Sequence, residues 1–310
     1  MRVLIVAAIR LFVVAAIALP GLAADKPRVT LLVKSLANEF FVTMVEGAKA
    51  HAAANRDKYS LNVRGVPWEK DLALQARQLD EAIAERPAAI VIAPISSTEL
   101  NPQLKKAVQA GIIVINIDNK LDDRSLAGLE LNIPFVGPSN RAGARMAGDY
   151  VGSKLRSGDE VAIIEGASNA VNGQARTAGF REAMDAVGAK VVQVRSGEWE
   201  IARGEIVASD MLKAYPKLRA LLCDNDNMAI GAIEALRKAG KTGQVLVAGY
   251  DNIPAVKPLI KSGALTATID QFASKQAEFG IELALKAIQE KTGQAALPAI
   301  VQTQVQLVTQ

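Results

Sequence analysis

Short apolar segments alternate with helical patterns along most of the chain, and this alternation strongly constrains the fold. The apolar segments are rich in Val, Ile and Leu, which is typical of strands buried on both faces. Helical stretches of roughly 15 to 20 residues separate most of them. Such alternation predicts parallel sheets with right-handed crossovers. The expected strands lie at 28–34, 61–65, 88–94, 112–118, 160–166, 191–196, 218–224, 246–251 and 265–270.

The alternation is interrupted once, at 121–140, and then resumes. This segment has no clear period and contains Pro134 and Pro138. The chain has 310 residues, of which 50% are hydrophobic, so it is long enough for more than one core. We therefore predict an α/β fold with two similar lobes, and we expect 121–140 to form the first crossing between them.

Residues 1–24 have the pattern of a cleavable export signal. Two arginines and an apolar run at 11–19, too short to span a bilayer, are followed by Pro20 and small residues. The alternative is an N-terminal membrane anchor, which is disfavoured because Arg10 precedes the run and Pro20 ends it. Cleavage is expected after one of two residues, Ala23 or Ala24.

Charge and residue counts exclude several classes of protein. Removing the signal takes two of 36 basic residues and none of 32 acidic ones, which leaves a net charge of 34 − 32 = +2. The charges are scattered, so we expect no nucleic-acid partner. Cys223 and His51 are the only cysteine and histidine, so a disulfide, a zinc site and a Ser-His triad are all unsupported. We expect no metal, no cofactor and no catalytic residues.

Polar side chains follow several predicted strands at the point where each strand ends. Lys34 and Asp118 end the first and fourth strands, Asp251 ends a later one, and Asn225 and Gln271 lie at two more ends. Open parallel sheets bind ligands beyond the carboxyl ends of their strands. We therefore expect these residues to line one cleft between the lobes.

Structural roles are the alternative for each of these residues. Asn38 or Asp251 could cap a helix, and Phe40 and Phe41 could be core residues. Asp118 and Asp251 could also be the carboxylate pair of a glycosidase. We favour hydrogen-bond acceptors, because a cation, Lys34 or Arg176, is expected beside each carboxylate and would hold it ionised.

Several segments together resemble the periplasmic sugar-binding proteins of the ribose and allose group, which are the soluble receptors of ABC importers. The resemblance covers essentially all of 25–310 and is strongest to the allose-type members. It is carried by VKSLANEFF (33–41), APISS (93–97), VINIDNK (114–120), NGQAR (172–176), LLCDNDNMAIGA (221–232) and LTATIDQ (265–271).

The resemblance implies a type I periplasmic binding protein, in which two Rossmann-like lobes are joined by a three-segment hinge. The crossings are expected near 136–140, 270–273 and 298–303. The implied N-terminal lobe comprises 25–137 and 272–299, and the implied C-terminal lobe comprises 138–271 and 300–310.

The resemblance also implies a set of sugar contacts. Trp199 matches the position of a second aromatic wall. Asn119 departs from the pattern, because allose-type members have an acidic residue there and ribose-type members have Arg; asparagine offers a donor and an acceptor without charge. The expected contacts are Lys34, Asn38, Phe40, Phe41, Asp118, Asn119, Arg176, Trp199, Asn225, Asp251 and Gln271.

The chemistry of these residues suits a neutral monosaccharide. Aromatic rings cover the apolar C–H faces of a sugar, and bidentate polar side chains satisfy its hydroxyl rim. The four expected charges, two cations and two carboxylates, cancel. We expect a monomeric receptor without catalytic turnover that closes on an allose-like aldose and delivers it to an ABC permease. A receptor for ribose or a sugar alcohol, an exported carbohydrate hydrolase and an additional chemoreceptor partner stay open.

Overall fold

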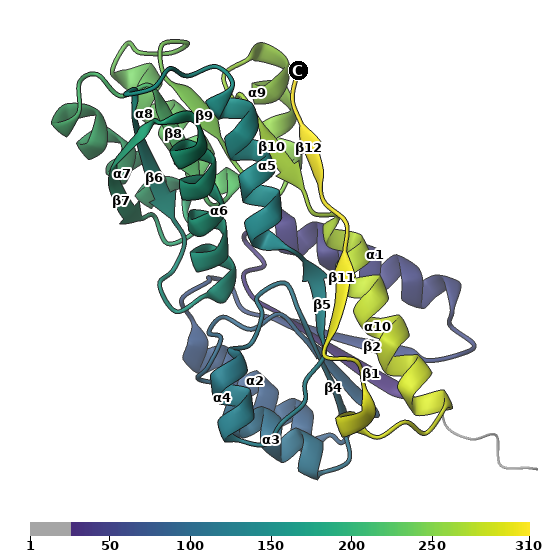
Figure 1. The fold of residues 1–310 in the computed structure, drawn as a ribbon. Coiled ribbons are helices and arrows are strands. Elements are labelled where there is room, and N and C mark those ends of the chain that lie inside the picture. Colours follow the sequence, from purple (N-terminus) through teal and green to yellow (C-terminus); the bar gives the residue numbers. More distant parts are fainter. Residues whose placement is uncertain (1–25) are drawn as a thin grey trace, which may run out of the picture.

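The computed structural model describes residues 26–310, which form two lobes (Figure 1). The predicted signal at 1–24 lies outside the described residues. Between residues 26 and 310, none of the helices combines the length and the apolar character needed to cross a membrane.

The first lobe is built on a parallel six-stranded sheet with the order β11-β5-β4-β3-β1-β2. Its strands are β1 (Arg28–Val33), β2 (Ser60–Gly65), β3 (Ala89–Ile92), β4 (Ile113–Ile117), β5 (Phe135–Pro138) and β11 (Ile300–Thr303). Its helices are α1 (Glu39–Ala54), α2 (Leu72–Ala84), α3 (Asn101–Gln109), α4 (Asp123–Gly128), α10 (Ala273–Gln289) and the short η2 (Gln294–Ala296).

The second lobe contains a parallel four-stranded sheet, β7-β6-β8-β9, and a separate antiparallel pair, β10-β12. Its strands are β6 (Glu160–Glu165), β7 (Lys190–Ser196), β8 (Ala220–Cys223), β9 (Leu246–Ala248), β10 (Thr268–Asp270) and β12 (Gln306–Val308). Its helices are α5 (Asn140–Gly152), α6 (Val171–Val187), α7 (Ile201–Ala214), α8 (Asp226–Lys238), η1 (Pro254–Val256) and α9 (Lys257–Ser262).

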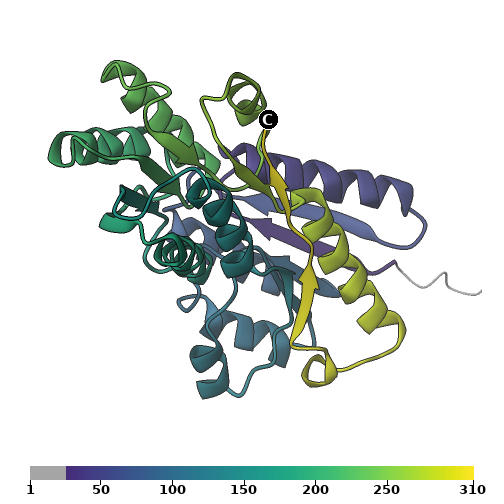
Figure 2. The same cartoon turned by 45° about the horizontal axis from the view of Figure 1, so that its top comes forward.

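Strand β1 shows why the apolar segments are uninterrupted. Leu31 and Val33 pack into the core that contains α1 and α10, whereas Leu32 faces the opposite core with Leu79 of α2 and Leu104 of α3. Both faces of the strand are therefore covered by helices, which explains why four of its six residues are Val or Leu. Helices α1 and α10 lie side by side on one face (Figure 2).

Three chain segments connect the lobes (Figure 1). The first runs from β5 to α5 and the second from β10 to α10, near the predicted crossings. The third lies between β11 and β12, at residues 303–306, rather than at 298–303.

The expected assignment of 300–310 to the second lobe is therefore wrong in its first residues. Strand β11 pairs in parallel with β5 and extends the first sheet, and only β12 pairs with β10 of the second lobe. Both strands contain apolar and polar residues and continue almost directly into one another, so no break in the sequence marks the crossing.

The predicted strands all contain a strand in the structure, usually shorter by one or more residues. The segment at 121–140, which was expected to be an aperiodic crossing, instead contains helix α4 and strand β5. Because α4 has six residues and β5 has four, neither is long enough to show a period.

Candidate ligand-binding site

A narrow cavity lies between the two lobes, where the carboxyl ends of both sheets meet. The space between its side chains is small, about 220 Å³ with the solvent at its mouth included, so it excludes an extended chain. The first lobe lines it with Lys34, Asn38, Phe40, Phe41, Glu69 and Asp118, and the second with Asn172, Arg176, Trp199, Asn225 and Asp251.

The ends of the strands and the first turns of the helices place these side chains. Lys34 directly follows β1, and Asp118 directly follows β4. Asn38 is the N-cap of α1, where its Oδ1 accepts a hydrogen bond from Phe40 N at 3.0 Å. Asn225 caps α8 in the same manner. The capping role and the position at the cavity are thus combined in one residue.

Lys34 is the centre of the charged cluster on the first lobe. Its Nζ lies 3.3 Å from Asp118 Oδ2 and 3.6 Å from Glu69 Oε2, and all three side chains are almost fully buried. Burial alone would lower the pKa of Lys34, but the two carboxylates outweigh it and the pKa is raised. Burial raises the pKa of Glu69, whose Oε1 also accepts a 2.9 Å hydrogen bond from Asn38 Nδ2.

Arg176 is the corresponding cation on the second lobe. Its Nη1 donates to Asp224 O at 2.8 Å and to Asp251 Oδ1 at 3.3 Å, and its Nε donates to Asn140 Oδ1 at 2.8 Å. The guanidinium also lies 3.8 Å from the ring centroid of Tyr250. The protein itself therefore fixes Arg176 in one orientation.

Asp251 differs from the expectation that its cation holds it ionised. Burial raises its pKa well above the usual range, and the attraction of Arg176 opposes this without overcoming it. The set of ionisable groups is also larger than expected, since Glu69 adds a third carboxyl group to the two cations on the cavity.

Two aromatic rings from opposite lobes flank the same space. The Lys34 ammonium lies 5.4 Å from the ring centroid of Phe41 and 5.6 Å from that of Trp199. Phe40 packs edge to face against Phe41, with the centroids 5.1 Å apart. Apolar walls therefore stand on both sides of a centre lined by charged and amide groups.

Three of the lining residues have a strained backbone. Asp118 has a φ of 62°, Trp199 of 68° and Asp251 of 119°, a region that side chains other than glycine rarely adopt. Such outliers concentrate at functional sites, where the surrounding structure holds them in place. The strained backbone of these three residues therefore indicates that the cleft is a functional site.

The structure does not bring two predicted contacts to the cavity. Gln271 lies behind Asp251, and its Nε2 donates to Asp251 Oδ1 at 2.7 Å, so it supports the wall. Asn119 is fully buried; its Oδ1 accepts from Ser97 and from Asn172 N, and its Nδ2 donates to Pro94 O. Asn119, which was expected to contact the sugar, thus makes its hydrogen bonds to other groups of the protein.

Sequence analysis missed two residues that line the cavity, Glu69 and Asn172. Glu69 lies four residues beyond the end of β2, just as Asn38 lies five residues beyond β1, so the strand-end argument could have found it. Asn172 lies four residues before Arg176 in α6 and hence on the same helix face, which is a second available signal.

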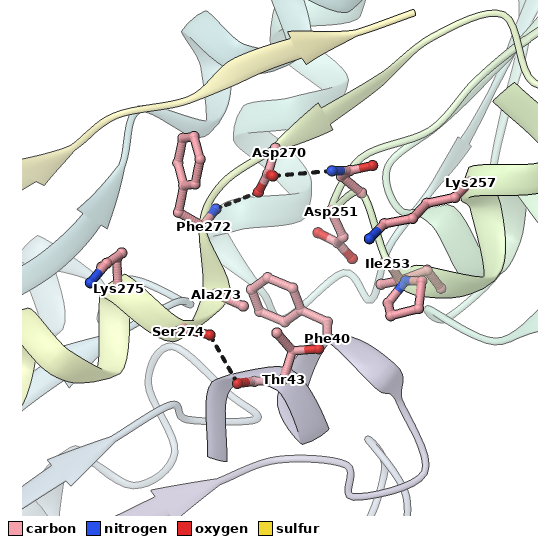
Figure 3. A pocket seen from close by; sticks show the side chains of 12 residues that line it. Phe40, Thr43, Asp251, Ile253, Lys257, Asp270, Phe272, Ala273, Ser274 and Lys275 are labelled. Carbon is pink, nitrogen blue, oxygen red and sulfur yellow. Dashed lines mark hydrogen bonds between the residues drawn. The ribbon is translucent and has the colours of Figure 1, made fainter. Parts of the chain in front are cut away.

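A second, open groove adjoins the cavity (Figure 3). Phe40 and Asp251 line both spaces, and the Phe40 ring stands in the middle of the groove beside the start of α10. Ser274 Oγ donates to Thr43 O at 3.1 Å and ties α10 to α1 at its floor. Phe40 therefore separates the closed cavity from the surface.

The part of the chain that the structure describes shows no candidate metal-binding site. Residues 26–310 contain no group of His, Cys, Asp and Glu side chains arranged to hold a metal ion. Cys223 is a buried free thiol within β8.

Comparison with known proteins places this architecture in context. Residues 29–292 match the model of the periplasmic binding protein domain. The chain is 51% identical to a D-ribose/D-allose-binding protein of Pseudomonas aeruginosa, over 92% of this chain and 89% of that one. It is 33% identical to a D-allose-binding periplasmic protein of Escherichia coli, over 85% and 84% of the two chains.

Solved structures agree with this assignment. An ABC transporter solute-binding protein of Burkholderia multivorans, with an unknown ligand represented as α-D-erythrofuranose, has 56% identity and a TM-score of 0.90; 92% of this chain and all of that chain are covered. A periplasmic solute-binding protein of Actinobacillus succinogenes with bound D-allose has 32% identity and a TM-score of 0.85, over 92% and 98%. This chain therefore belongs to the periplasmic binding protein family and has the fold of its type I members, like these sugar-binding components of ABC transporters.

Proposed function

We propose that this protein captures a neutral monosaccharide, D-allose or a closely related aldose, by closure of its two lobes, and passes it unchanged to an ABC permease. The observation that carries the proposal is the cavity itself. It encloses a small space with an aromatic ring on each side and at least five amide, cationic or carboxylate side chains between them. A monosaccharide presents the complementary surface, with two apolar faces and a polar rim.

The charges of the cavity support an uncharged ligand. Lys34 lies between two carboxylates, and Arg176 donates to Asp224 O and to Asp251, so each cation already has acceptors within the protein. A phosphate or carboxylate ligand would have to displace those partners in a buried setting, which is costly. Hydroxyl groups can instead accept from the cations and donate to the carboxylates together.

The relatives' ligands narrow the sugar class. One relative is described as binding D-ribose and D-allose, another as binding D-allose, and one solved neighbour contains D-allose. We place D-allose first and D-ribose second. Export by removal of residues 1–24, with cleavage after Ala23 or Ala24, a monomeric state and the absence of turnover belong to the same proposal.

Thermal-shift and calorimetric screening of residues 25–310 against aldoses, ketoses and polyols tests the proposal. A ligand that binds only the folded protein raises its melting temperature, by mass action. We expect D-allose to give the largest or second-largest shift and to be recovered unchanged. Absence of a shift with every sugar, or release of a hydrolysed product from a glycoside, would contradict the proposal.

A further inference from the structure

Helix α6 begins without a cap of its own. Its N-cap residue is Ala170, which has no side chain able to accept a hydrogen bond. The first N–H groups of a helix have no partner inside the helix, and Ser, Thr, Asp or Asn usually supplies one at this position. This helix carries Asn172 and Arg176, which line the cavity.

The first lobe supplies the missing cap. Val171 N donates to Ser97 Oγ at 3.0 Å, and Asn172 N donates to Asn119 Oδ1 at 3.3 Å. Ser97 lies in the loop after β3 and Asn119 in the loop after β4, so both acceptors belong to the other lobe. Each of these two hydrogen bonds therefore crosses the cleft.

The two acceptors form one connected unit. Ser97 Oγ lies 3.1 Å from Asn119 Oδ1 and donates its own proton to it, while Asn119 Nδ2 donates to Pro94 O at 3.1 Å and fixes the orientation of the amide. Ser97 N also donates to Asn169 O at 3.1 Å, directly before the helix. Both side chains are almost completely buried.

We propose that Ser97 and Asn119 are positioning residues that cap α6 only when the lobes are closed, and thereby hold the closed cavity together. Separation of the lobes breaks both hydrogen bonds at once and leaves the two amides to water. The pair stabilises the closed form without contacting the ligand. It therefore slows the dissociation of every sugar that the cavity binds. This role rests on the proposed function, since it requires a ligand that is held by closure.

The role differs from selection among sugars, which was the expectation for Asn119. If an amide side chain hydrogen-bonds the hydroxyl groups of the sugar, its truncation changes the order of affinities among different sugars. An amide that caps a helix across the cleft changes all affinities by the same factor. A neutral hydrogen bond of this kind corresponds to roughly 3- to 10-fold in an equilibrium constant.

Ser97→Ala and Asn119→Ala test the proposal, with Ser96→Ala as the matched control. Ser96 is equally buried, but its Oγ accepts from Thr98 N and Glu99 N of its own loop. With D-allose and D-ribose as probes, stopped-flow dissociation should be about 3- to 10-fold faster in both test variants and unchanged in the control. The order of the two sugars should stay the same, and the double variant should show less than the product of the single effects, because the two side chains share a hydrogen bond.

Amide hydrogen exchange gives a second readout, of the two capped amides themselves. The amides of Val171 and Asn172 should exchange faster in the two test variants than in Ser96→Ala when sugar is bound, and equally fast in all three variants without sugar. Equal exchange with sugar bound and equal dissociation in all three variants would overturn the proposal, and a reversed order of sugars in Asn119→Ala would show that Asn119 reads the ligand. If the unaltered protein binds neither sugar, the proposed function fails and the capping role, which requires a form closed on a ligand, fails with it; if the unaltered protein binds and the variants do not differ, the capping role alone fails.

Discussion

The two lobes present similar charged groups to the cavity but hold them differently. On the second lobe, Arg176 donates three hydrogen bonds to the protein and stacks on Tyr250. On the first lobe, Lys34 lies between two carboxylates, at 3.3 and 3.6 Å, and faces the rings of Phe41 and Trp199. Within the described residues, Asp118 Oδ2 has no hydrogen-bond partner of good geometry.

The difference indicates that the two halves of the site have different roles in folding and in ligand binding. The second-lobe half is organised by the fold, because its cation is fixed before any ligand contact is considered. The first-lobe half keeps unused hydrogen-bonding capacity in a buried setting, where an unpaired polar group is costly. A sugar hydroxyl that pairs with Asp118 would remove that cost, so we expect ligand contacts to contribute most there.

Truncation of Arg176 should have the largest effect. Arg176→Ala removes the cation beside Asp251 and leaves Asp224 O without its donor in a buried region; breaking a buried pair in this way typically costs about 3–5 kcal/mol of unfolding free energy. Sugar binding should be lost as well. Urea denaturation of the ligand-free variant measures the first effect, and Arg176→Lys is the control that keeps the charge but not the planar fork. Wild-type stability in Arg176→Ala would contradict the view that the fold organises this half.

Asp118 should behave in the opposite way. Asp118→Asn keeps the size of the side chain but removes the charge, and Lys34 keeps Glu69 as a partner. Binding of D-allose should weaken by about 2–4 kcal/mol, or roughly 30- to 1000-fold, whereas the unfolding free energy should change by less than about 1 kcal/mol. Calorimetry and denaturation on the same preparation separate the two effects. A variant that loses stability but binds normally would reverse the comparison.

A pH-dependent stability should come mainly from the second lobe. Burial raises the pKa of Asp226 to about 7, against an ordinary value of 3.8. The folded protein then binds a proton more tightly than the unfolded chain does, so this contribution is fully present below pH 4 and is lost as the pH rises to about 7. Asp226→Asn, which can still accept from Ile253 N and pair with Thr268, should flatten the stability profile between these values. An unchanged profile would show that Asp226 does not titrate in this range.

The ion pair at the rim of the cleft should contribute least. Lys70 Nζ lies 2.5 Å from Glu198 Oε2 and links the lobes, but the lysine is 52% exposed. Exposed pairs contribute about 0.2–1 kcal/mol and are screened by salt. Lys70→Ala should therefore weaken sugar binding no more than about fivefold at low salt and have no effect at high salt. A larger loss that persists at high salt would place Lys70 among the residues that determine closure.

The sequence predicted the fold where the signal was long and apolar. Strands such as Arg28–Val33 and Glu160–Glu165 were evident because helices cover both of their faces. Strands β5, β11 and β12 were not predicted, because each has only three or four residues and none lies in a longer apolar segment. The third crossing was misplaced for the same reason.

The candidate site was predictable to a similar extent. Residues directly at strand ends, such as Lys34 and Asp118, were found from their position. Glu69 was missed although it lies only four residues beyond β2, in the loop at the same edge of the sheet. Asn119 was expected at the ligand from the family resemblance, yet its amide is used by Ser97 and by the first turn of α6. Such partners lie far apart in the sequence and become visible only when the two lobes are placed together.

Small-angle scattering during a titration with D-allose tests the central claim most directly, since that claim is that two lobes close over one monosaccharide. The radius of gyration should fall as the sugar saturates the protein, with the same midpoint as the heat of binding. Arg176→Ala should show neither change. A radius of gyration that stays constant at saturation, in a protein that calorimetry shows to be fully bound, would contradict closure of the lobes as the mode of capture.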